Sequence, residues 1–435
     1  MIAHRRTACL HISVATLAAL MFVSAHPVAA QSRTGPRTDT LSARARDSLI
    51  AAVLADTLDI DADTAALLAP LSAIRQTFTL RPTFRSYAVG NVNAAEQTGY
   101  ASWVARFRRA TVRVDLTPVS YTGDTNTTAT ERPQVGFSGV SPISARLDVR
   151  VRGADTLRVF AQTMSFPGAL TSIDARALGA VGTSTVDLDA GAIGIAARAG
   201  IRYTHTQPLG HDGIALTLRG GAEYEPKPGT TESISWRGTT LRGALGVNRS
   251  GASGSVGTTI EFSRSYADSL GGRNLFPGGG SVTVDARATR YVGADGSGVV
   301  SIAAFYAKPV GIERPDQPTR IIPVGDFGGI SASAAIPVGQ VTLLPVIGLQ
   351  RETSNAVAIV SGRRTTLDAS GQTASVSFGV SLPLGRIVTL TPEVGGVFGN
   401  VGQTVSAQFP RQVRSQTFTD PIRGGWVSIE VSVSR

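Results

Sequence analysis

The residues with the greatest capacity for chemistry are few, and their spacing does not suggest catalysis. His205 and His211 flank a short turn close to Asp212, so they are either a metal-binding or proton-transferring pair or two polar turn residues. No further histidine or carboxylate stands at ligand spacing around them, which favours the turn. No nucleophile elbow with its acid and base partners is found. We expect no catalytic residue, no metal and no cofactor, and therefore no enzyme.

Asp59, Asp61 and Asp63 begin like a calcium-binding loop. Such a loop needs glycine at its sixth position and glutamate at its twelfth, where this chain has Thr64 and Pro70. Capping of a short helix that Pro70 ends explains these aspartates better. The glycines at 278–280 lack the lysine and the helix that a phosphate-binding loop requires.

A larger set of charged residues recurs at alternate positions. In such a pattern the charges either line a water-filled lumen and set its electric field, or neutralise one another as cross-strand ion pairs. Both interpretations stay open from the sequence. The residues predicted to face a lumen are Arg113, Asp115, Arg146, Asp148, Arg150, Arg198, Arg202, Arg219, Glu223, Glu261, Asp285 and Arg287.

The elements that carry these charges are predicted to be strands. From about Gln76 onward apolar and polar residues alternate with a period of two, as in residues 111–117, 144–151 and 281–288. Each stretch is a ribbon with one apolar and one polar face. A soluble sandwich turns the apolar face inward, whereas a membrane barrel turns it toward lipid.

Three features favour the membrane barrel. The polar face is charged in strand after strand, and 48 glycines leave little bulk for a packed core. The connections also alternate in length, as in barrels of the outer membrane. Tight turns are expected near 153–155, 249–251, 293–296, 337–340 and 383–386. Long connections are expected near 122–141, 164–188, 268–280, 309–327, 353–374 and 401–423.

The N-terminus has the order of features read by the secretion machinery. Arg5 and Arg6 precede an apolar run at 17–23, and Val28-Ala29-Ala30 provides small residues for cleavage after Ala30. Residues 1–30 are therefore predicted to be a signal peptide. The single cysteine, Cys9, lies within it, so the exported chain needs no disulfide.

Charge and hydropathy narrow the class of protein. The net charge of +10 comes from scattered arginines without a basic cluster, so we expect no nucleic-acid partner. No stretch after the signal peptide is apolar for about 18 residues, which excludes a helical membrane protein. At about 9–11 residues per strand plus connections, residues 76–435 predict an all-β, antiparallel transmembrane β-barrel of about sixteen strands, within a range of about 12 to 18.

Residues 76–435 resemble a bacterial outer-membrane β-barrel of the porin or hydrophobic-substrate transporter kind. The resemblance is architectural. It implies outer-membrane lipid and the barrel-insertion machinery as partners, and passage of an unknown small solute. The terminal strand fits, with Val427, Ile429, Val431 and Val433 alternating, although Arg435 replaces the usual final aromatic residue.

Residues 31–75 precede this barrel. They contain a helical pattern at 41–69 that is expected to be periplasmic or to plug the lumen. The alternative functions are a surface structural or adhesion barrel with a closed lumen, and a secreted soluble β-sandwich that binds carbohydrate.

Overall fold

The computed structural model describes most of the region predicted to form the barrel. The described residues are 75–124, 134–163, 166–167, 197–210, 213–225, 238–266, 280–293, 297–310, 320–322, 326–360, 363–409 and 412–435. The predicted signal peptide, the helical pattern at 41–69, the aspartates at 59–63 and His211 lie outside them.

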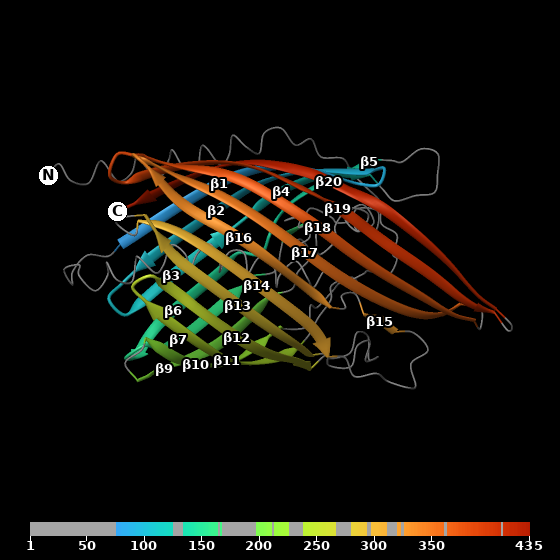
Figure 1. Ribbon diagram of the computed structural model, residues 1–435, viewed down its shortest axis with the longest axis horizontal. Coiled ribbons are helices and arrows are strands. Elements are labelled where there is room, and N and C mark those ends of the chain that lie inside the picture. The colour runs from blue at the N-terminus through green and yellow to red at the C-terminus, as the bar shows by residue number, and fades with distance from the viewer. Residues whose placement is uncertain are drawn as a thin grey trace.

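Strands make up nearly all of the described chain (Figure 1). The first half contains β1 (Arg75–Val89), β2 (Val92–Arg106), β3 (Ala110–Leu116), β4 (Pro118–Asp124), β5 (Gln134–Val140), β6 (Ser144–Arg152), β7 (Asp155–Gln162), β8 (Phe166–Pro167), β9 (Arg198–Leu209) and β10 (Ile214–Tyr224). The second half contains β11 (Thr239–Gly251), β12 (Gly254–Tyr266), β13 (Gly280–Val292), β14 (Gly298–Val310), β15 (Arg320–Ile322), β16 (Phe327–Val338), β17 (Val341–Val360), β18 (Arg363–Leu384), β19 (Val388–Phe409) and β20 (Gln412–Ser434).

These strand segments form one antiparallel sheet that closes on itself. Each strand pairs with its neighbour in the chain, and β20 returns to pair with β1 through Thr79↔Ser432 and Val89↔Ile422. Four barrel strands are each divided in two, because β3 with β4, β5 with β6, β7 with β8 and β15 with β16 lie end to end against shared neighbours. The result is the predicted closed barrel of 16 strands.

The break between β3 and β4 has a simple cause. Both segments pair with β2 in one uninterrupted register, Ala101↔Leu116 below the break and Thr98↔Val119 above it. Pro118 begins β4 and has no backbone N–H to donate to the ladder, so pairing lapses there without bending the strand out of the barrel.

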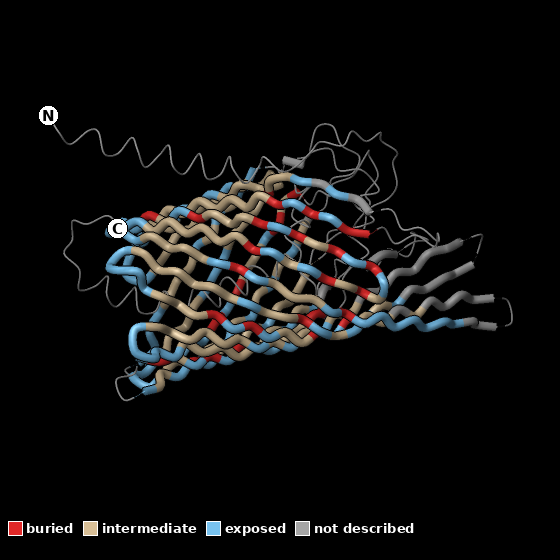
Figure 2. The backbone as a smooth tube through the Cα atoms, turned by 90° about the horizontal axis from the view of Figure 1, so that it is seen from above, coloured by how far each residue is buried: buried red, intermediate tan, exposed pale blue. Residues whose placement is uncertain are grey.

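The two ends of the barrel differ. At one end, the turn end, short connections at 107–109, 153–154, 252–253, 339–340 and 385–387 join the strands, and both barrel termini lie there. Figure 2 shows these exposed turns at the end where the C-terminus lies. Gly339 and Gly385 take positive φ values of 63° and 84°, which tight hairpin turns require. Four of the five predicted tight turns are thus confirmed to within a few residues, and residues 294–296 of the fifth lie outside the described residues.

The opposite, loop end carries the long connections at 125–133, 168–197, 225–238, 267–279 and 311–319. Two predicted loops are wrong. Residues 353–374 and 401–423 continue as strands, so that β17–β20 have 20, 22, 22 and 23 residues whereas β9–β14 have 11–13. These stretches are polar and were therefore expected to be loops. In the structure their backbones instead form hydrogen bonds with one another as neighbouring strands. In Figure 1 β17–β20 project well beyond the remaining strands.

Candidate pore wall

The strand register places all the predicted lumen residues on one face of the sheet. Residues that pair directly in an antiparallel sheet lie on the same face, and alternate residues of a strand share it. The pairs that connect the set are Arg113↔Arg146, Asp148↔Arg158, Arg158↔Arg202, Arg202↔Gly221, Gly221↔Arg242, Ala244↔Glu261 and Thr259↔Asp285.

The opposite face is the outside of the barrel. It carries large apolar side chains that remain exposed, among them Phe262 (55%), Ile347 (58%) and Val427 (54%). Two of the largest fully buried side chains, Glu96 and Tyr121 at 1%, belong instead to the charged face. The charged face therefore points inward and the apolar face outward, which is the reverse of a soluble sandwich.

Glu223 on β10 is the centre of the largest inward ion-pair network. Its carboxylate lies 2.9 Å from Nε of Arg242, 3.6 Å from Nη1 of Arg198 and 3.8 Å from Nη2 of Arg202. Arg242 also donates to Oε1 of Glu261 at 3.1 Å. Five side chains from β9–β12 thus form one network in which guanidinium and carboxylate groups are neighbours across strands.

A second network occupies the wall of β2–β7. The carboxylate of Asp148 lies 2.7 Å from Nε of Arg146 and accepts a hydrogen bond from Nε of Arg158 at 2.6 Å. Asp115 accepts from Nε of Arg113 at 2.9 Å and from the hydroxyl of Tyr100 at 2.7 Å. These contacts are those of the ion-pair alternative, although Arg146 and Asp148 lie two apart on one strand rather than across strands.

The remaining predicted residues also lie on the inward face. Arg150 is exposed near the turn end. Arg219, Asp285 and Arg287 share the inward face of β10 and β13. Whether any of the twelve lines a path for solutes stays a prediction.

The sequence analysis missed several inward residues. Arg158 and Arg242 are central to the two networks, and Arg85 and Glu96 form an inward pair between β1 and β2. Each of these residues occupies an alternate position on the polar face of its strand. Applying the alternation of polar and apolar residues to every strand would therefore have found them.

The wall opposite the networks is built from small residues. Around β14–β20 one row of directly paired inward positions consists of Ala303, Ser331, Gly348, Ser375, Val397 and Gly424. Such side chains project little into the barrel. Charged networks therefore line one arc of the inside, and this row of short side chains, two of them serines, lies on the other arc.

The candidate histidine site lies elsewhere. Nδ1 of His205 is 2.8 Å from Oδ1 of Asp155, and the hydroxyl of Tyr203 donates to the same carboxylate at 2.7 Å. This cluster lies near the turn end on the outer face, while His211 and Asp212 are outside the described residues. In the described part of the chain no group of three or more His, Cys, Asp or Glu side chains is placed to hold a metal ion.

The closed antiparallel sheet, the inward charges and the outward apolar side chains together define the architecture of the chain. It is a closed antiparallel barrel of 16 strands with an apolar outer face, the arrangement that β-barrels use to cross a membrane. Among the residues that the structure describes, no helix is long and apolar enough to cross a membrane.

The chain has similar solved structures but no similar sequence among the proteins compared. No protein-family model and no curated protein matches the sequence. Solved structures that match include OprB of Pseudomonas putida (TM-score 0.43, 10% identity, 83% of this chain and 94% of that chain). Others are OmpT, an outer membrane protein of Vibrio cholerae (0.35, 10%, 83% and 100%), and OccK7 of Pseudomonas aeruginosa (0.36, 9%, 83% and 99%). Because these TM-scores are low, the architecture of the barrel is established by the strand pairing of this chain itself.

Proposed function

We propose that the barrel lies in a bacterial outer membrane and lets small hydrophilic solutes pass without an energy source. The observation that carries this proposal is the two-faced wall of the closed sheet, whose inward face holds the charged networks and a row of short side chains and whose outward face is apolar. A barrel of about sixteen strands encloses more space than its inward side chains can fill, and polar walls hold water in that space.

The outer face supports the placement in a membrane. Between the two rims it presents apolar side chains that no described residue covers, such as Ile302, Leu349 and Val394. An exposed apolar belt of this size on a closed barrel fits hydrocarbon. By analogy with outer-membrane barrels, the turn end faces the periplasm and the loop end the outside. Export through cleavage after Ala30, and assembly by the barrel-insertion machinery, belong to the same proposal.

One observation favours a second function at the cell surface. The projecting parts of β17–β20 form a four-stranded sheet beyond the other strands (Figure 1), as a binding surface of an adhesion barrel would. This function does not exclude passage of solutes, but it needs no open lumen.

Conductance separates the two functions. The exported chain in a planar lipid bilayer should give stepwise currents, and a variant that lacks residues 41–69 should give larger or more frequent steps if that segment is a plug. Unchanged currents after the deletion would place the segment outside the lumen. Silence of both proteins would contradict passage of solutes and leave the surface function.

A further inference from the structure

The outward face of the barrel changes from apolar to basic at one level. On β17 the outward residues Ile347 and Leu349 are 58% exposed, and the next outward residue is Arg351. On β20 the outward residues Ile429 and Val427 lead past Gly425 to Arg423. On β14 Ile302 and Tyr306 are followed by Lys308. The apolar stretch from the turn end is about 10 residues in each case, the length that crosses a membrane as a tilted strand.

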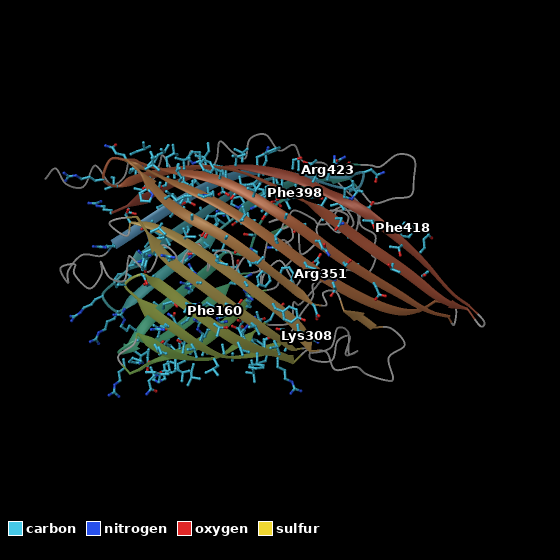
Figure 3. All side chains as sticks on the ribbon, viewed as in Figure 1. Phe160, Lys308, Arg351, Phe398, Phe418 and Arg423 are labelled. Atoms are coloured by element: carbon cyan, nitrogen blue, oxygen red, sulfur yellow. The ribbon has the colours of Figure 1, made fainter. Side chains whose placement is uncertain are left out.

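The strand register sets Arg351 and Arg423 within one outward position of each other. Arg351 pairs with Gln372, which pairs with Asn400, so polar outward residues follow one another across three strands. Arg423 pairs with Phe398, one outward position nearer the turn end than Asn400. Figure 3 shows Lys308, Arg351 and Arg423 at nearly the same height along the barrel, with Phe418 farther out.

The next two outward rows of β17–β20 consist of polar residues and one glycine. One row contains Ser370 and Thr419, and the row two residues farther from the turn end contains Asp368, Thr404 and Thr417. In that second row the hydroxyls of Thr404 and Thr417 are 3.0 Å apart. The basic residues therefore mark the plane at which lipid contact ends and water begins.

Arg351 and Arg423 differ from the inward arginines in having no acid beside them. Both side chains are exposed, and neither forms an ion pair with any residue that the structure describes. The inward Arg146, Arg158 and Arg242 each contact a carboxylate within about 3 Å. Lys308 is left out of the proposal below, because Tyr306, the preceding outward residue on its strand, already donates a hydrogen bond to Asp326 at 2.8 Å and so brings an acid to this part of the face.

We propose that Arg351 and Arg423 bind the phosphate groups of anionic lipids in the outer leaflet. A guanidinium matches a phosphate with two parallel hydrogen bonds. The apolar side chains next to each arginine, Leu349 and Val427, would contact the acyl chains of the same lipids, while the arginine reaches the headgroup. The two arginines are three strand spacings and one outward position apart, about 16 Å, so they would hold neighbouring phosphates. This proposal rests on the membrane placement given above but not on an open lumen.

The test uses the full exported chain in vesicles of phosphatidylcholine that contain a minor share of phosphatidic acid. After gentle extraction, native mass spectrometry counts the lipids of each class retained by the protein. The wild type should retain phosphatidic acid about tenfold or more above its share, since each basic residue near an anionic surface contributes roughly a fivefold preference. The variant R351Q/R423Q should lose most of this enrichment, whereas R351K/R423K should keep part of it.

Two controls decide the interpretation. The R249Q variant removes an outward arginine near the turn end and should keep the enrichment of the wild type. Millimolar inorganic phosphate in the extraction buffer should not displace the lipid, because a free phosphate lacks the acyl chains. Equal enrichment in wild type and R351Q/R423Q, or displacement by free phosphate, would overturn the proposal. Failure of the wild type to enter vesicles would contradict the membrane placement itself, whatever the conductance result.

Discussion

Arg85 on β1 and Glu96 on β2 face each other inside the barrel, with Nη1 of Arg85 2.9 Å from Oε1 of Glu96, and the side chain of Glu96 is completely buried. The two strands are joined by a two-residue turn in which Gly90 has a positive φ of 61°. The first hairpin of the barrel, which also closes the sheet against β20, is therefore organised around one buried charge pair.

Removing one partner of this pair should destabilise the barrel strongly. We expect R85M to lower the free energy of unfolding by about 3–5 kcal/mol, because it removes the guanidinium that lies 2.9 Å from the buried carboxylate of Glu96. The double variant R85M/E96Q should recover most of that loss, and R150Q, at an exposed inward position, should change stability by less than about 0.5 kcal/mol. Denaturant unfolding in detergent, followed by tryptophan fluorescence, measures all three. An R85M variant as stable as R150Q would contradict the role given to the pair.

Gly395 on β19 is required by its neighbour on β20. A Cβ atom at Gly395 would meet the indole ring of Trp426, whose Nε1 donates to Oε1 of Glu393 at 3.2 Å. We expect G395A to lower the stability by about 1–3 kcal/mol through overpacking. G220A is a matched control, because nothing lies within 4 Å of the position of its Cβ. Equal unfolding midpoints for the two variants would show that the ring moves aside without loss.

Single charges in the networks should set the preference of the pore for anions or cations. Replacing Arg242 by glutamine removes a positive charge from the wall, so the current should shift toward cations. Replacing Glu261, its partner at 3.1 Å, by glutamine should shift the current toward anions. A wall charge acts on a nearby ion by about 1 kcal/mol in water, which limits each change in the permeability ratio to about fivefold. Reversal potentials across a salt gradient measure the shift, and the same potential for both variants would mean that the network lies off the path.

The period of two was enough to predict the barrel, its strand count and the face of every predicted charge. Residues such as Val284 and Asp285 alternate so regularly that the register has little freedom. The extent of β17–β20 could not be predicted from residues 353–374 and 401–423. Beyond the lipid a strand needs no apolar face, and the strand character of these polar residues comes only from their pairing with one another. The partners of Glu223 were likewise hidden, because three arginines from two neighbouring strands reach it.

Thiol modification of the conducting protein tests the central claim most directly, because Val284 and Asp285 are adjacent on β13 but belong to opposite faces. Cys9 is the chain's single cysteine and lies in the predicted signal peptide, so each variant should carry one thiol. A charged, water-soluble thiol reagent added to D285C in a planar bilayer should reduce its stepwise current, while V284C should keep its current under the same treatment. Reduction in V284C but not in D285C, or no current from either protein, would contradict a water-filled barrel whose charged face lines the pore.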